Sequence, residues 1–130
     1  MKLTKVVLLA IALVNLPNLL AQRQIGEVAQ IRDAAKRDLL GLYTNTGLGH
    51  VTTVWELLDD PARLSAFRQQ PDVDAAQVDR LIARFEKAGK LYWGLSGLGD
   101  LRNANVAPDV LAREEQHLAA LDAELDHLVD

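Results

Sequence analysis

The longest unbroken hydrophobic run of the chain is residues 6–14, which read VVLLAIALV. Two lysines precede this run, and Pro17 interrupts the apolar pattern before a second short run, Leu-Leu-Ala, that ends at Ala21. A basic start, a short apolar centre and a small residue at a cleavage point form the layout of a secretory signal. The pattern therefore predicts a targeting segment at residues 1–21 and a single domain at residues 22–130.

Three interpretations of this segment stay open. A secretory signal would be cut after Ala21, although Leu19 is a less usual residue two places before a cut. An uncleaved anchor would cross a membrane with residues 3–21. The uncharged stretch between Lys5 and Arg23 has 17 residues and would span about 26 Å as a helix, which is slightly less than a hydrocarbon core of about 30 Å. The third interpretation is a buried core helix, which a domain of this size rarely covers on all sides.

The two lysines ahead of the apolar run also predict an orientation. Positive residues favour the cytoplasmic side of a membrane, so the N-terminus would stay in the cytoplasm. We therefore expect a protein that is exported or membrane-anchored, with its C-terminal domain outside the cytoplasm.

Beyond the targeting segment, apolar residues recur three and four positions apart, which is the pattern of amphipathic helices. This spacing predicts helices at about residues 24–43, 74–88 and from 108 onward. A capping box, Thr53 to Glu56, predicts a short helix at 53–59. Asp60 followed by Pro61 predicts another at 60–70. Gly89 is read as the stop of the 74–88 helix, and the glycine-containing stretch 91–106 as a connection.

These elements predict an all-α fold class. The N-terminal apolar helix, acting as signal or anchor, would be followed by a small bundle or open array of four to five helices. No segment beyond the N-terminus shows the period of two that marks a strand.

Composition narrows the chemistry. The chain has no cysteine, which excludes disulfides, CxxC zinc sites, iron–sulfur clusters and a cysteine nucleophile. Its net charge is −4, and loss of Lys2 and Lys5 would make it −6. An acidic balance disfavours nucleic acid as a partner, because phosphate binding needs cations. Apolar residues make up 49% of the chain, which is ordinary for a folded domain.

Two Glu-x-x-His pairs lie near the C-terminus, Glu114 with His117 and Glu124 with His127. A carboxylate and an imidazole three positions apart share a helix face, and di-metal bundles use this pairing. Such bundles take the pairs from different helices, whereas both pairs here lie on one predicted helix. The main interpretation is a solvated acidic face with no metal and no cofactor, and the alternative is a small periplasmic metal- or ligand-binding bundle.

Two further features carry weaker hypotheses. The stretch 94–99, GLSGLG, suggests a phosphate-binding loop, but no lysine follows it and Asp100 would repel an anion. The longer segment 91–100 also resembles residues 42–50, either by duplication or by chance. His50, beside a glycine turn, could act as a base with Asp59, Asp60 or Asp100, although nothing in the sequence places these residues together. An enzyme is therefore the less favoured class.

The candidate partner surfaces are aromatic and leucine-rich. Tyr92 and Trp93 adjoin the glycine stretch, and amphipathic rings are favoured at protein and membrane interfaces. A leucine seam with heptad-like spacing marks the last helix and would face either the protein's own core or another helix; it comprises Leu111, Leu118, Leu121, Leu125 and Leu128. The sequence thus predicts a non-catalytic protein-interaction protein, for example an accessory subunit of a membrane or envelope assembly.

Overall fold

The computed structural model describes residues 25–129. This part of the chain is all-helical and contains no strand, which confirms the predicted class. Its five helices lie within the predicted range of four to five. The helices are α3 (Ile25–Thr44), α4 (Val54–Leu58), α5 (Pro61–Arg68), α6 (Ala75–Asn103) and α7 (Pro108–Val129). The predicted targeting segment, residues 1–21, lies outside the described residues. None of the described helices has the length and hydrophobicity needed to cross a membrane.

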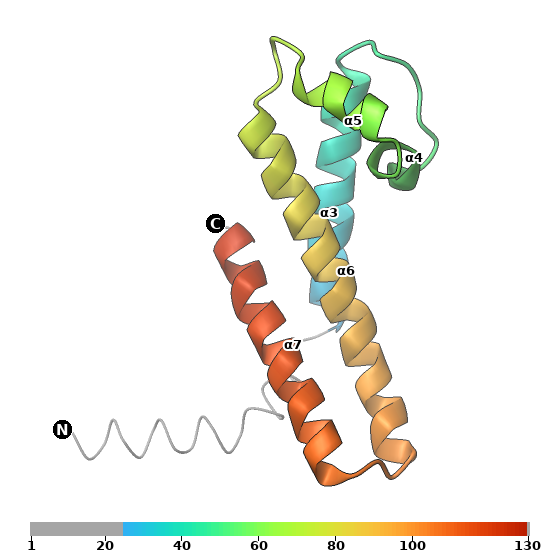
Figure 1. The fold of residues 1–130 in the computed structure, drawn as a ribbon, viewed down its shortest axis with the longest axis vertical. Helices are drawn as coiled ribbons and strands as arrows, with labels where there is room; N and C mark the ends of the chain where they lie inside the picture. The colour runs from blue at the N-terminus through green and yellow to red at the C-terminus, as the bar shows by residue number, and fades with distance from the viewer. Residues whose placement is uncertain (1–24, 130) are drawn as a thin grey trace, which may run out of the picture.

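The longest helix, α6, organises the fold. It runs the length of the molecule and packs against both α3 and α7 (Figure 1). The short helices α4 and α5 lie at one end, beside the C-terminal half of α3 and the first turns of α6 (Figure 1). The result is an open arrangement of three long helices with two short ones covering one end.

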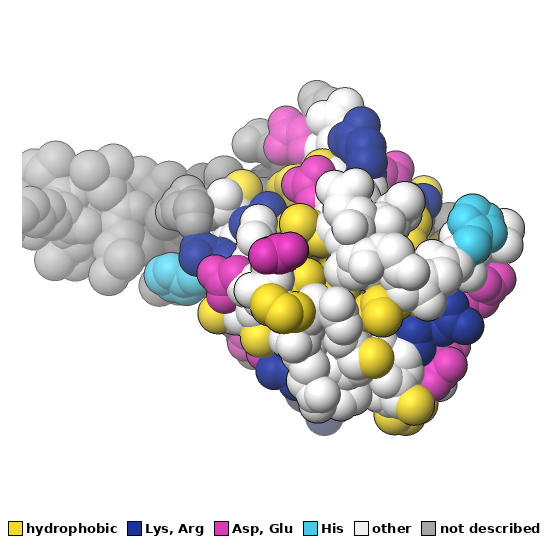
Figure 2. Space-filling view, turned by 90° about the horizontal axis from the view of Figure 1, so that it is seen from above, with side chains coloured by type: hydrophobic (Ala, Val, Ile, Leu, Met, Phe, Trp, Pro, Cys, Tyr) yellow, Lys and Arg dark blue, Asp and Glu magenta, His cyan; other side chains and the backbone are white. Residues whose placement is uncertain are grey.

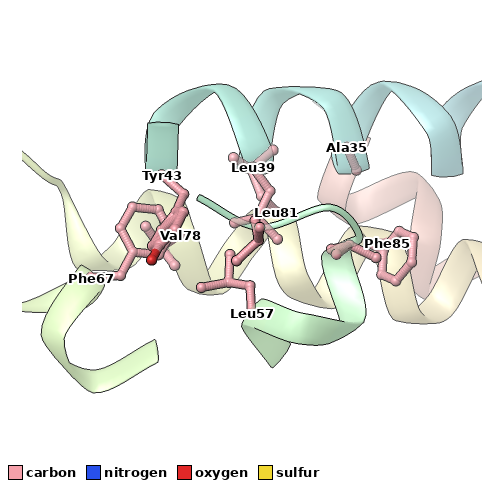
Figure 3. Packing of buried hydrophobic residues seen from close by; sticks show 10 residues of the cluster. Ala35, Leu39, Tyr43, Leu57, Phe67, Val78, Leu81 and Phe85 are labelled. Carbon is pink, nitrogen blue, oxygen red and sulfur yellow. The ribbon is translucent and has the colours of Figure 1, made fainter. Parts of the chain in front are cut away.

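Two hydrophobic clusters hold the helices together. The first joins α3, α4, α5 and the first half of α6, as Figure 3 shows for Leu39, Leu57, Phe67 and Leu81. The second joins α6 and α7 to the start of α3 at Val28. Full burial of a leucine or phenylalanine contributes about 1.5–3 kcal/mol, so these clusters supply the main stabilisation of a chain without disulfides.

The start signals read from the sequence are confirmed as helix caps. The Thr53 hydroxyl accepts from the Glu56 amide at 3.4 Å, and the Glu56 carboxylate accepts from the Thr52 amide at 3.1 Å. The Asp60 carboxylate accepts from the Arg63 amide at 3.1 Å. Asp74 caps α6 by accepting from the Ala76 amide at 3.0 Å. Each cap satisfies an amide that the first turn of a helix leaves unpaired.

The predicted stop at Gly89 is wrong, because α6 continues without a break to Asn103. Leu91, Leu95 and Leu98 keep the three- and four-residue spacing of the buried face through the glycine stretch. Each interior glycine costs a helix about 1 kcal/mol relative to alanine, and the packing of these leucines offsets that cost. The chain reverses instead after Asn103, where Asn105 has a φ of 55°.

This correction removes the phosphate-loop hypothesis and weakens the echo between the two glycine segments. Residues 94–99 are helical in α6, so their amides are hydrogen-bonded within the helix. In the first segment, by contrast, Gly47 and Gly49 have φ values of 73° and 136° and form the turn that follows α3. The two similar sequences therefore adopt different local structures.

Candidate functional site

The leucine seam of α7 packs mainly against the protein itself. Leu118, Leu121 and Leu125 are buried in the second cluster, and Leu111 packs against it while partly exposed. Leu128 is also half-buried. The sequence left two roles open for this seam, and the structure places Leu118, Leu121 and Leu125 in the protein's own core.

The paired aromatics of α6 have different surroundings. Tyr92 is half-buried, and the Arg32 guanidinium of α3 lies 4.5 Å from the centre of its ring. Trp93 packs edge-on against Tyr92 at a ring-centre distance of 5.2 Å, and it is 70% exposed. Tyr92 is thus held by a cation–π contact, whereas Trp93 presents most of its indole to solvent.

Trp93 lies beside a surface hollow of about 850 Å³ that runs along α6. We call this hollow the outer groove. One wall is formed by α3 and α4, and the other by α7. Its lining residues are Arg32, Asp33, Lys36, Val54, Trp55, Phe85, Glu86, Gly89, Lys90, Trp93, Gly94, Glu114, His117, Leu118 and Leu121.

Two glycines of α6 shape this groove. A Cβ atom at Gly89 would meet nothing within 4 Å, so the missing side chain leaves open space. A Cβ at Gly94 would lie 2.2 Å from Leu118 Cδ2, so that glycine allows α7 to approach α6 closely. The same helix therefore uses glycine once to leave a hollow and once to bring in a neighbouring helix.

Trp55 is a groove residue that sequence reasoning did not single out. It is 54% exposed, and its ring lies 5.4 Å from the ring of Phe85 on α6. Trp55 follows the Thr53 cap by two residues, so the start of α4 determines where its ring points. No sequence signal links Trp55 to Trp93, because 38 positions separate them and only the packing of α4 on α6 brings them to one groove.

Charges of both signs surround the groove. Arg32 pairs with Asp33 at 3.2 Å. Glu86 and Lys90 are exposed and one helical turn apart on α6, and neither forms a close ion pair within the described part of the chain. Lys90 nevertheless lies near enough to Glu124 of α7 to help lower the pKa of that carboxylate. Both side chains are exposed, so a partner protein could form close ion pairs with them. The end of the molecule formed by α4 and α5 also carries charges of both signs, but its exposed hydrophobic side chains form only small, separate groups (Figure 2).

The two Glu-x-x-His pairs do not come together. They are ten positions apart on α7, which is about 15 Å along a helix. Glu114 and His117 line the outer groove, whereas Glu124 binds Lys87 of α6 at 2.6 Å. This Lys87 contact lowers the pKa of Glu124. Within residues 25–129, no group of three or more histidine or acidic side chains is placed to hold a metal ion.

His50 lies in the exposed turn that follows α3. Its backbone carbonyl accepts from Arg63 at 3.4 Å, and the same guanidinium donates to the Tyr43 hydroxyl at 3.2 Å. Asp60 lies 3.6 Å from Arg63 and is already engaged with it. The last turns of α6, which carry Asp100, are at the opposite end of the molecule (Figure 1). The structure therefore does not assemble the His50–Asp100 pair.

No protein-family model matches the chain, and no curated protein or solved structure matches it significantly. Two exposed indole rings, the hollow at Gly89 and charges of both signs meet at the outer groove, which is therefore the candidate functional site of the described residues.

Proposed function

We propose that this protein is a non-catalytic, helical protein-interaction protein that binds a protein partner through the outer groove. The observation that carries the proposal is the exposure of Trp93 and Trp55 beside one hollow. Tryptophan is enriched among the residues that dominate binding energy, and such residues cluster around pockets. Covering about 100–150 Å² of indole surface contributes on the order of 3 kcal/mol, which is a large share of the energy of a protein contact.

The proposed address follows from the N-terminal sequence. Residues 1–21 would export the domain or hold it at a membrane, with the outer groove on the non-cytoplasmic side. The partner would then be an exported protein or a subunit of a membrane or envelope assembly. In this setting the protein would act as an accessory subunit.

The experiment places a photo-crosslinking amino acid at position 93 or 55 of the full-length chain, in cells that make the protein. Position 27 on α3 provides the matched control, because Glu27 is exposed and does not line the outer groove. We expect defined adducts at 93 and 55, none at 27, and the protein in the exported or membrane fraction. A protein found only in the cytoplasmic soluble fraction, without adducts at 93 and 55, would refute the proposal.

A small-molecule ligand is the second candidate for the same groove. Its volume of about 850 Å³ lies within the usual range of ligand pockets, roughly 300–1,000 Å³. The mass of the adducts distinguishes the two roles, because a protein partner adds thousands of daltons and a small ligand adds hundreds. Metal analysis of the purified protein, compared with a His117→Ala/His127→Ala variant, tests the metal-binding version of this candidate.

A further inference from the structure

The exposed face of α6 has a pattern that matches its own reverse. Ala83, Glu86, Lys90 and Trp93 follow one another at successive turns on this face, and the last three are exposed. The first half offers a small residue and an acid, and the second half offers a base and a large aromatic ring. Each half is therefore complementary in size and charge to the other.

We propose that the partner in the outer groove is a second copy of this chain, with the two α6 helices packed antiparallel around a two-fold axis. This inference rests on the proposed function and names the partner. In a two-fold contact, residue i of one copy meets residue j of the other, and j meets i. Glu86 then faces Lys90 of the second copy, and Ala83 faces Trp93 of the second copy. Both pairs are centred on the same position, residue 88, so one axis satisfies both.

The neighbouring residues fit this axis. Gly89 lies next to the centre, where its missing side chain lets two helices approach closely. Trp55 packs on Phe85. It therefore lies beside the part of α6 that contains Ala83 and Glu86, which is the part that would contact Trp93 of the second copy. In this arrangement Trp93 of each copy is covered, two ion pairs form across the contact, and Trp55 lines the same groove beside it.

A parallel contact is disfavoured by the same residues. It would place Glu86 against Glu86 and Lys90 against Lys90 of the second copy. Like charges face to face in an interface oppose association. The order of charges along α6 therefore selects the antiparallel arrangement.

Charge reversal tests the inference with the full-length chain, measured by sedimentation velocity in one fixed buffer or detergent. The Glu86→Lys variant and the Lys90→Glu variant should each weaken self-association at least about tenfold, because each creates two like-charge pairs. An equimolar mixture of the two variants should associate again, since the two lysines of the first variant then face the two glutamates of the second. The chain that carries both reversals should also self-associate as the original does.

Matched controls separate this effect from general charge and from folding. Glu27→Lys and Arg37→Glu change exposed charges of α3 outside the outer groove and should leave self-association unchanged. Circular dichroism should show the same helicity in every variant. Self-association that occurs through the apolar N-terminal segment would persist in both single charge-reversal variants, and that result would overturn the inference. An equimolar mixture of the two variants that fails to associate would also overturn it.

The crosslinking experiment distinguishes failure of this inference from failure of the proposed function. Adducts of twice the chain mass at position 93 would support both. Adducts to a different protein would overturn the second-copy inference and leave the proposed function standing. The absence of any adduct at 93 and 55 would overturn both.

Discussion

Replacement of Gly94 by alanine probes how closely α7 approaches α6. The added Cβ would lie 2.2 Å from Leu118 Cδ2 and 3.4 Å from Leu118 Cγ. Leu118 is only 1% exposed and belongs to the second cluster, so its side chain has no solvent to move into. Relief of the clash therefore requires α7 to shift or neighbouring core side chains to repack.

Two effects of opposite sign determine the size of the change. Alanine in place of glycine stabilises a helix interior by about 1 kcal/mol, whereas overpacking of a core costs about 1–3 kcal/mol. We expect Gly94→Ala to lower the free energy of unfolding by about 0–2 kcal/mol, which is the difference between these two effects. At Gly97, also in α6, a Cβ would meet nothing within 4 Å, so Gly97→Ala should stabilise by about 1 kcal/mol.

Urea unfolding of the full-length chain, followed by circular dichroism, measures both variants under one condition. Leu118→Ala should cost about 2–5 kcal/mol on its own. In the Gly94→Ala background it should cost less, with a coupling of about 1 kcal/mol or more, because the two groups compete for the same space. If Gly94→Ala stabilises as much as Gly97→Ala and the two effects at 94 and 118 simply add, the close approach of α7 to α6 is wrong.

Three further predictions concern a cap, a core residue and an ion pair. Asp74→Ala should destabilise by about 1 kcal/mol, because it removes the cap of α6, and Asp74→Ser should restore most of the loss in the same urea assay. Phe67→Ala should cost about 3–5 kcal/mol and raise hydrogen exchange in α5, because the ring is fully buried and packs edge-on against Tyr43 at 5.4 Å. Lys87 lowers the pKa of Glu124 in the folded protein. This ion pair therefore stabilises the fold at pH values above the pKa of Glu124 in the unfolded chain, and the stabilisation is lost as the pH falls through the pKa of the folded state. Glu124→Gln should reduce the acid-induced drop in the urea midpoint, and an unchanged drop would contradict this prediction.

The helices and their starts could be predicted because their signals are local. The acid or hydroxyl at each cap lies within three positions of the amide that it satisfies, as at Thr53, Asp60 and Asp74. The stripe that ends in Leu39 and Tyr43 of α3 is likewise visible in the spacing of residues along the chain. Such features depend on helix geometry alone, which the sequence expresses directly.

The path of α6 through its glycines could not be predicted in this way. Local propensity favours a stop at Gly89, and the benefit that overrides it comes from residues distant in sequence. Leu91, Leu95 and Leu98 pack in the same cluster as Val28 of α3 and Leu118 of α7. The free energy gained by burying these leucines exceeds the cost of the helical glycines only once α3, α6 and α7 are packed together. No short segment of the sequence shows this gain, because the contacting residues are far apart along the chain.

The candidate site also depends on the continuation of α6 through Gly89. If the chain had turned at Gly89, as local propensity suggested, Lys90 and Trp93 would not continue the face that begins at Ala83 and Glu86. Because α6 runs straight through, these four residues share one face, and Gly89 leaves the hollow beside it. Gly89, where local propensity favours a helix end, is therefore also the residue that opens the outer groove. A bulky residue at 89 should close the groove without breaking the helix.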